Sequence, residues 1–354
     1  MSFTLSKGDR VVVTGAAGFI GSAVTRALVS RGVEVVALLE PGASSSNLDG
    51  LDVSRLDVDV TDRAQLGSVF SGARYCFHLA AKFGFWPRDP SSFYAVNVQG
   101  TKNVLTAAAA QGVQRIVYTS SVATLGLWRT KAGMPATEDD VADVAHLHGN
   151  YKQSKYVAEH EVLRLAAQGT PVVLVLPTMP HGPFDYRPTP SGKVVLDYLN
   201  GQIPGFVNTA MNVAHVDDLA EGHVLALERG LQGRSYICGG ENITMSQLLE
   251  ILSRVTGLPP AQRRFPDAFA LAAGYASDFI EGRILGREPR VPLEAAKMSA
   301  TYMTFDDSRA RHELGYVSRP ADEALYESAK WFADHGYVTS ERAALVRFNP
   351  PPSR

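Results

Sequence analysis

The segment TGAAGFIG at residues 14–21 constrains the fold of this chain more than any other. It follows the apolar run Val11–Val13 and precedes a helix-like stretch, so its three glycines lie where a strand passes into a helix. In such a turn the first glycine allows the bend, the second lets the backbone approach a pyrophosphate, and the third permits close packing of helix on strand. The first helical amides then face the phosphates. For the glycines alone, an ordinary tight turn is the simpler alternative. The residues expected to contact a dinucleotide here are Gly15, Gly18, Phe19, Ile20 and Gly21.

Strand-like and helix-like segments alternate along the first half of the chain. This alternation predicts an α/β fold, a Rossmann-type doubly wound parallel sheet with helices on both faces. Helices are expected after Gly18, from about Ser91 to Gln111, and from about Asn150 to Ala167. The expected strands are Arg10–Thr14, Glu34–Leu39, Val53–Val60, Arg74–Leu79, Gln114–Thr119 and Pro171–Leu176.

The pattern changes after Pro177, where proline-bearing segments and then helices with few strands follow. We therefore expect a dinucleotide-binding Rossmann domain over residues 1–177 and a smaller, mostly helical substrate-binding lobe over residues 178–345. The stretch GRSYICGG at 233–240 is typical of a strand, so an element near 205–240 is expected to return to the main sheet. The tail, residues 346–354, is expected to be flexible.

Composition excludes several classes of function. The net charge of the 354-residue chain is −2 and no basic block is present, so a nucleic-acid partner is not expected. No apolar stretch approaches membrane-spanning length, and the first apolar run is too short for a secretion signal, which favours a cytoplasmic protein. Cys76 and Cys238 lie in apolar, strand-like runs typical of buried thiols. Neither His181 nor His215 has the spacing of a metal ligand, so no metal site is expected.

The end of the second expected strand bears on the choice of cofactor. Dinucleotide sites commonly offer an acid to the adenosine ribose there, or an arginine to a ribose phosphate. This chain has Glu40 at that position. A carboxylate accepts hydrogen bonds from the ribose diol and repels a 2′-phosphate, so NAD is favoured, with NADP as the alternative. Asp59 and Val60, at the end of the following strand, are expected to contact adenine.

Tyr151 and Lys155 lie four residues apart in YKQSK, so their side chains leave one helix on the same face. A phenol with a pKa of about 10 is a poor acid or base, and a nearby ammonium would stabilise its phenolate. The ammonium can also donate to the nicotinamide ribose. The triplet TSS at 119–121 adds Ser121, which could bind the substrate oxygen while Tyr151 transfers the proton, and Thr119, an expected cofactor contact. This set predicts hydride exchange between a nicotinamide and a carbinol carbon.

These motifs resemble those of the extended short-chain dehydrogenase/reductase family over nearly the whole chain. The matching segments are TGAAGFIG at 14–21, HLAA at 78–81, NVQGT at 97–101, TSSVATLG at 119–126, YKQSK at 151–155, HVDDLAEGH at 215–223 and DDSRARHELGY at 306–316. The resemblance implies a catalytic triad of Ser121, Tyr151 and Lys155, with Asn97 ordering the active-site helix or a water. It also implies a homodimer formed through the helices at 91–111 and 150–167. Further cofactor contacts that it implies are Leu79, Ala80, Ala81 and Pro177.

Within this family the sequence is similar to dihydroflavonol 4-reductases, 3β-hydroxysteroid dehydrogenases and hopanoid-associated sugar epimerases. Sugar-nucleotide epimerases usually carry an arginine four residues before the histidine of the HV element, where it binds the diphosphate. Met211 takes that position here, and a thioether cannot neutralise a diphosphate. The second arginine, usually found in an RxGD context, also has no match. These departures weaken the reading as an epimerase of nucleotide sugars.

Apolar residues dominate the segments expected around the substrate. Such a lining suits a flat or hydrophobic ketone better than a polyhydroxylated sugar. The sequence therefore predicts an NAD(P)-dependent alcohol dehydrogenase or ketoreductase acting on a hydrophobic or aromatic small molecule. A sugar epimerase or dehydratase that oxidises transiently and retains its cofactor is the alternative. A nucleotide-sensing binding module is disfavoured, because the glycine turn and the catalytic set are both intact. The expected substrate contacts are Phe83, Phe85, Trp86, Leu125 and Met211.

Overall fold

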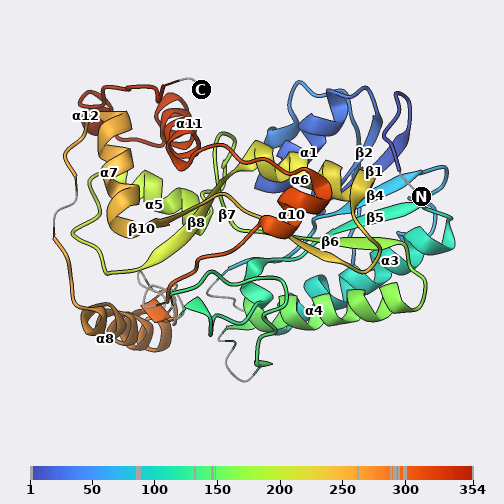
Figure 1. Ribbon diagram of the computed structural model, residues 1–354, viewed down its shortest axis with the longest axis horizontal. Coiled ribbons are helices and arrows are strands. Elements are labelled where there is room, and N and C mark those ends of the chain that lie inside the picture. The colour runs from blue at the N-terminus through green and yellow to red at the C-terminus, as the bar shows by residue number, and fades with distance from the viewer. Residues whose placement is uncertain are drawn as a thin grey trace.

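The computed structural model describes residues 3–84, 89–130, 133–144, 147, 149–260, 263–287, 289, 293, 296–297 and 301–352. Figure 1 shows a large sheet with helices on both faces beside a smaller, mostly helical lobe. The predicted fold class is confirmed.

Seven parallel strands form the main sheet within the described residues, in the order β3-β2-β1-β4-β5-β6-β9. The order runs outward in both directions from β1, which is the doubly wound arrangement. The final strand pairs in parallel with β6, so the segment at 233–240 does return to this sheet. The strands are β1 (Arg10–Thr14), β2 (Glu34–Leu39), β3 (Ser54–Asp57), β4 (Tyr75–His78), β5 (Arg115–Thr119), β6 (Val172–Pro177) and β9 (Ser235–Cys238).

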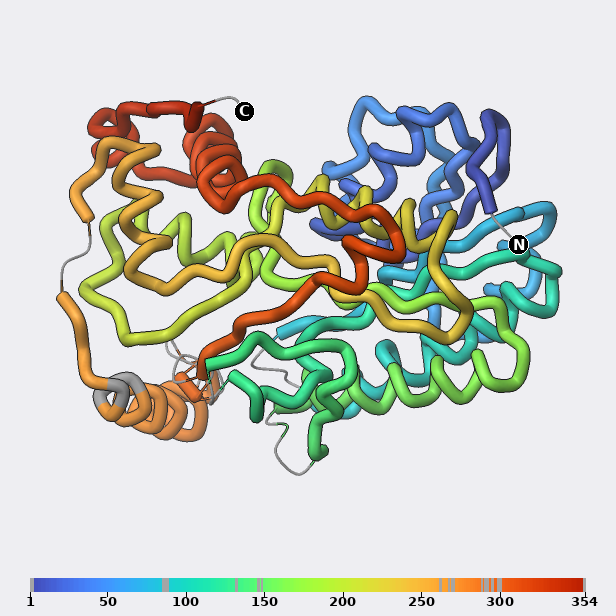
Figure 2. Tube along the Cα trace, viewed as in Figure 1, coloured from blue at the N-terminus to red at the C-terminus, as the bar shows by residue number. Residues whose placement is uncertain are grey.

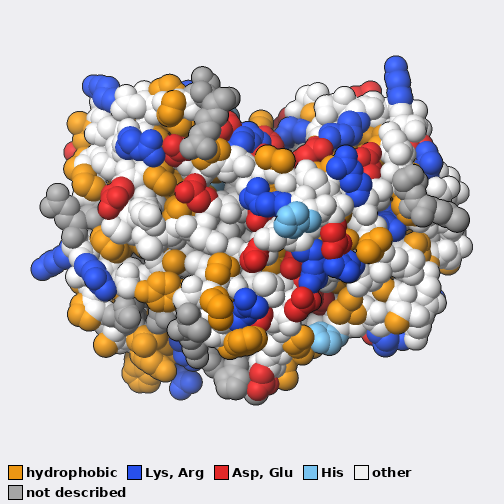
Figure 3. Space-filling model, in the orientation of Figure 1, with side chains coloured by type: hydrophobic (Ala, Val, Ile, Leu, Met, Phe, Trp, Pro, Cys, Tyr) orange, Lys and Arg blue, Asp and Glu red, His pale blue; other side chains and the backbone are white. Residues whose placement is uncertain are grey.

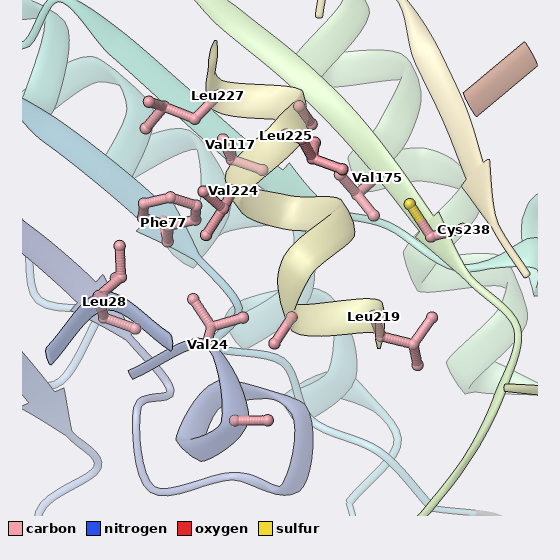
Figure 4. Packing of buried hydrophobic residues seen from close by; sticks show 14 of the residues in the cluster. Val24, Leu28, Phe77, Val117, Val175, Leu219, Val224, Leu225, Leu227 and Cys238 are labelled. Atoms are coloured by element: carbon pink, nitrogen blue, oxygen red, sulfur yellow. The ribbon is translucent and has the colours of Figure 1, made fainter. Parts of the chain in front are cut away.

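Helices cover both faces of this sheet because its central strands are apolar on both sides. Val11 and Val13 of β1 pack with α1 (Phe19–Val29) and α6 (Val216–Arg229) on one face. Figure 4 shows α6 lying over the strands, with the apolar side chains of α1 beside it. Val12 points to the opposite face, where it packs with α3 (Thr101–Ala110) and α4 (Asn150–Ala167).

The helix expected from about Ser91 to Gln111 is interrupted by a π-helical turn. The turn, η2 (Ala95–Gly100), lies between α2 (Ser91–Tyr94) and α3. Such turns are often found at functional sites, and this one carries Asn97. A Cβ on Gly100 would come within 2.8 Å of the Val60 side chain, so the π-helical turn lies close to the segment that follows β3.

The second lobe has its own three-stranded sheet, in the order β10-β8-β7, and its own apolar core. The chain crosses between the two parts more than once, as the yellow and orange segments of Figure 2 show. This lobe is mostly helical, as predicted. Its elements are β7 (Met179–His181), α5 (Pro190–Leu199), β8 (Ala210–His215), β10 (Glu241–Thr244), α7 (Met245–Thr256), α11 (Ala321–Asp334) and α12 (Ser340–Ala343).

The remaining elements are η1 (Ser46–Leu48), η3 (Val122–Thr124), α8 (Asp267–Ser277), η6 (Asp278–Ile284) and α10 (Ser308–Leu314). Hydrophobic side chains gather at the lower left of Figure 3, over α8 and η6. We call this set the α8 stripe: Tyr275, Phe279, Ile280, Ile284 and Leu285, each at least half exposed. Across the described ranges, none of the helices has the length and apolar character needed to cross a bilayer. Both Cys76 and Cys238 are free and buried.

Candidate active site

The glycine turn between β1 and α1 leaves no room for side chains. Gly15 has a φ of +67°, and a Cβ there would lie 2.7 Å from the Ala80 nitrogen. A Cβ on Gly21 would lie 2.0 Å from the Gly15 carbonyl oxygen. Gly18 is the N-cap of α1 and brings no capping side chain, so the first helical amides are left for another acceptor. This arrangement fits the pyrophosphate of a dinucleotide.

A buried threonine and histidine connect this turn to the end of β4. The Thr14 hydroxyl accepts a hydrogen bond from the Ala80 nitrogen at 3.1 Å and lies 2.6 Å from Nδ1 of His78. Nε2 of His78 lies 2.9 Å from the Thr101 hydroxyl on α3. Burial lowers the pKa of His78 to about 3, with a smaller contribution from Lys155, so the ring is neutral. Thr14 and His78 thus fix the expected cofactor segment Leu79–Ala81.

The residues expected at the adenosine end lie where β2 and β3 end. Glu40 is exposed and directly follows β2. The Asp59 carboxylate is exposed and accepts hydrogen bonds from the nitrogen and hydroxyl of Thr61, at 2.8 and 2.7 Å. Val60 is buried against Gly100. Glu40 is therefore a surface carboxylate, open to a bound ribose.

Tyr151 lies in the first turn of α4, close to two other predicted site residues. Its ring meets that of Phe83 edge to face, with the centroids 4.5 Å apart. Burial raises the pKa of Tyr151, and a hydrogen bond with the Ser121 side chain opposes that rise. Ser121 is the N-cap of η3, and its hydroxyl accepts from the Ala123 nitrogen at 3.1 Å. The three residues come from α4, η3 and the segment after β4.

Lys155 is almost fully buried, and its ammonium is directed at β5. It donates to the Tyr118 hydroxyl at 3.1 Å and to the Thr119 carbonyl at 2.7 Å. Burial lowers the pKa of Lys155 to about 7, although Glu159 opposes the shift. The sequence predicts a Tyr151 pKa lowered by Lys155, and the structure instead gives a raised one. The reason is that desolvation of the phenol dominates while the ammonium is engaged with Tyr118 and Thr119.

Asn97, on the π-helical turn, ties the segment after β4 to α4. Its amide exchanges hydrogen bonds with the Lys82 backbone, accepting from the nitrogen at 2.7 Å and donating to the oxygen at 3.0 Å. The same amide donates to the Ser154 hydroxyl at 2.9 Å. Ser154 directly precedes Lys155, so Asn97 sets the position of the helix that carries Tyr151 and Lys155.

The remaining predicted contacts lie in the apolar cores or at the ends of β5 and β6. Leu125 is buried beside the main sheet, and Met211 is 4% exposed in the core of the second lobe. The Thr119 hydroxyl is 2.9 Å from Nε2 of His223, a buried residue of α6. Pro177 ends β6 beside Cys238. The predicted contacts Phe85 and Trp86 lie outside the described residues.

Sequence reasoning missed a buried carboxylate on α4. Glu159 is 8% exposed and accepts hydrogen bonds from the Ser120 hydroxyl and, at 2.9 Å, from the Thr124 hydroxyl. Burial raises its pKa, while both hydroxyls and Lys155 lower it. The available signal was its position, one helical turn after Lys155, together with the middle serine of TSS.

Comparison with known proteins agrees with this geometry. Residues 11–239 match the model of the family described as NAD dependent epimerase/dehydratase family. The chain belongs to this family. It is therefore an enzyme of an NAD-dependent class, and the predicted extended short-chain dehydrogenase/reductase relationship is confirmed.

Members of this family with similar sequences include a putative dihydroflavonol 4-reductase from Synechocystis sp., 39% identical over 95% of this chain and 98% of the relative. Sterol demethylase protein B from Methylococcus capsulatus is 30% identical over 92% of this chain and 99% of the relative. Among solved structures, that of gox2253 superposes with a TM-score of 0.83 at 40% identity, covering 94% of this chain and all of the other.

Proposed function

We propose that this family member is an NAD-dependent reductase that transfers hydride to the carbonyl carbon of a bulky, apolar ketone. The observation that carries the proposal is the grouping of Tyr151 with Ser121 and Phe83: a proton donor, a hydroxyl and an aromatic face come together at one point. Residues 1–177 would bind the cofactor and residues 178–345 the substrate.

The protein's part in the reaction is proton transfer and positioning. NAD, in its reduced form, supplies the hydride. Because burial raises the pKa of Tyr151, its hydroxyl stays protonated at neutral pH and can donate to the carbonyl oxygen as negative charge develops there. The Ser121 hydroxyl would donate a second hydrogen bond to the same oxygen. Lys155 has three donors, two of which are used within the protein, and the third would reach the nicotinamide ribose.

The glycine turn and Glu40 support NAD as the cofactor. The uncapped first turn of α1 would receive the pyrophosphate, since helix amides and the helix dipole favour an anion there. The exposed Glu40 carboxylate would accept from the adenosine ribose hydroxyls and repel a 2′-phosphate. NADP is the alternative, and the experiment below measures both.

The names of several relatives support the substrate class. Besides the putative dihydroflavonol 4-reductase, a protein named 2-alkyl-3-oxoalkanoate reductase, from Shewanella oneidensis, is 29% identical over 88% of this chain. A protein named 4-hydroxy-2-methyl-3-oxo-4-farnesyl-3,4-dihydroquinoline-1-oxide ketoreductase, from Stigmatella aurantiaca, is 28% identical over 88% of this chain. Phe83, which is half exposed, offers such a substrate an apolar surface beside Tyr151.

A substrate screen tests the proposal. The purified enzyme is mixed with NADH or NADPH and with dihydroflavonols, 2-alkyl-3-oxoalkanoates, 3-oxosteroids or nucleotide sugars, and cofactor absorbance is followed. We expect net NADH oxidation with one of the three apolar classes. Cofactor that copurifies with the protein, with nucleotide-sugar interconversion and no net NADH change, would replace the proposal with the epimerase alternative.

A further inference from the structure

The middle serine of the TSS triplet has no part in the reaction described above. Ser120 is 3% exposed, and its hydroxyl points at α4, where it donates to the Glu159 carboxylate. Thr124, at the end of η3, donates to the same oxygen. Two hydroxyls from the segment after β5 thus contact one oxygen of a buried carboxylate. The single proton of the Thr124 hydroxyl is shared with the Ser121 carbonyl oxygen, 2.8 Å away, so Ser120 is the main donor. Both hydroxyls lower the pKa of Glu159, against the rise that burial causes.

The ammonium nearest to this carboxylate lacks an ionic partner in contact. Lys155 is 2% exposed, and both of its hydrogen-bond acceptors, the Tyr118 hydroxyl and the Thr119 carbonyl, are neutral. Among the residues that the structure describes, no carboxylate oxygen lies within ion-pair distance of Nζ. A buried ammonium without a compensating charge is costly and tends to lose its proton.

Glu159 follows Lys155 by one helical turn, so the two side chains share a face of α4. We propose that Glu159 is a positioning residue that keeps the Lys155 ammonium charged at the end of β5, with Ser120 and Thr124 holding its carboxylate in place. The inference rests on the proposed role of Lys155. The TSS triplet then serves both sides of the site: Ser121 faces the reacting oxygen and Ser120 the carboxylate that compensates the lysine.

The other groups around this pair do not compensate Lys155. His78 and His223 are buried and neutral, since burial lowers the pKa of each, to about 3 and about 4. Burial raises the pKa of Tyr118 and of Tyr151, so both phenols are uncharged at neutral pH. The titratable groups that face the pair from β4, β5, α6 and α4 itself are His78, Tyr118, His223, Tyr151 and His160.

The sign of the expected pH effect follows from the charges. Lys155 already titrates near pH 7, because burial lowers its pKa, and Glu159 opposes that shift. Removing the negative charge lowers the pKa of Lys155 further. The fraction of charged lysine at pH 7 therefore falls, and the alkaline limb of the activity profile moves to lower pH.

Titration of the lysine itself gives the test. The full-length protein, without cofactor or substrate, is labelled with ¹³C at lysine Cε, and the Lys155 resonance is assigned by its loss in Lys155→Met. In Glu159→Gln, which keeps an amide oxygen for Ser120 and Thr124, the midpoint should move to lower pH by about one unit or more. In Glu159→Asp, which keeps the negative charge, the midpoint should lie close to that of the parent protein. Glu161→Gln, a charge removal elsewhere on α4, should not move it.

An unchanged midpoint in Glu159→Gln would overturn the inference. If that variant does not fold, Thr124→Val takes its place. It removes one hydroxyl from the Glu159 carboxylate, and the midpoint of Lys155 must then move to lower pH by a smaller amount. Because the titration uses neither cofactor nor ketone, its result stands apart from the substrate screen. Where the screen finds a substrate, the alkaline limb of kcat in Glu159→Gln should move by the same amount as the lysine.

Discussion

At the scale of single residues, the environment of Tyr151 decides the protonation state in which its hydroxyl meets a substrate. A phenol whose pKa is raised by burial holds its proton at neutral pH, which suits a donor to a ketone oxygen more than a base toward an alcohol. The hydrogen bond with Ser121 lowers the pKa of Tyr151, but by less than burial raises it. Tyr151 therefore rests in the protonated form that the proposed ketone reduction requires.

Replacing Tyr151 by Phe removes this donor and keeps the ring that packs on Phe83. We expect kcat for ketone reduction to fall by about 10²–10⁴-fold while the NADH dissociation constant hardly changes. Stopped-flow absorbance and NADH fluorescence titration measure the two quantities. Tyr156→Phe, on the same helix, is the control and should keep full activity. Unchanged turnover in Tyr151→Phe would remove this residue from the mechanism.

Glu40 gives a second prediction for a single residue. Glu40→Arg replaces a carboxylate that repels a 2′-phosphate with a cation that attracts one, and the side chain is exposed enough to adapt. The ratio of NADPH to NADH affinity should rise by about tenfold, or roughly 1.4 kcal/mol. Titrations with both cofactors measure the ratio, and Glu40→Gln should give an intermediate value. If Glu40→Arg leaves both affinities as they were, the selector lies elsewhere.

At the scale of elements, we expect both the free energy of unfolding and the affinity for the cofactor to depend on the contact between α1 and the glycine turn. Gly21→Ala would place a methyl 2.0 Å from the Gly15 oxygen, so the helix must move away from the strand. We expect a loss of about 1–3 kcal/mol in the free energy of unfolding, as for other overpacked sites. Urea denaturation measures that loss.

The same displacement would move the first helical amides, so NADH binding should weaken in Gly21→Ala as well. Gly67→Ala is a matched control, because its Cβ meets only the Ala64 oxygen, at an ordinary 3.5 Å. That variant should keep both stability and affinity. A Gly21→Ala protein as stable as its parent would mean that the close packing is not required.

The sequence predicts an element well when residues that are close together in the sequence define it, and poorly when distant residues do. The bounds of β1, β2 and α4 agree with prediction to the residue, because apolar runs or a helical period end there at polar residues or glycine. The small sheet of β7, β8 and β10 was not predicted, since strands such as MPH and ENIT are short and lack alternation. Glu159 was missed for a related reason: its partner Ser120 is 39 residues away, and only tertiary packing joins them.

At the scale of the whole molecule, two exposed apolar patches are available for contact with a second copy. One is the α8 stripe. The other lies where α2 meets α4: Val157 is 40% exposed, Tyr94 is 36% exposed, and the Tyr94 hydroxyl donates to Gln153 at 3.2 Å. The second patch spans the two helices through which the family resemblance implies a homodimer. The same surface contains α4, so pairing there would also hold the helix that carries Tyr151.

We expect the protein to form a homodimer through the Val157 patch. Val157→Glu places a charge in the centre of an apolar contact, and an unpaired buried charge is strongly unfavourable, so the dimer should dissociate. Light scattering after gel filtration should give a mass near 38.2 kDa for this variant and twice that for its parent. Phe279→Glu, in the α8 stripe, is the matched control and should stay dimeric. Monomers from Phe279→Glu together with dimers from Val157→Glu would assign the interface to the α8 stripe instead, and a monomeric parent protein would exclude both.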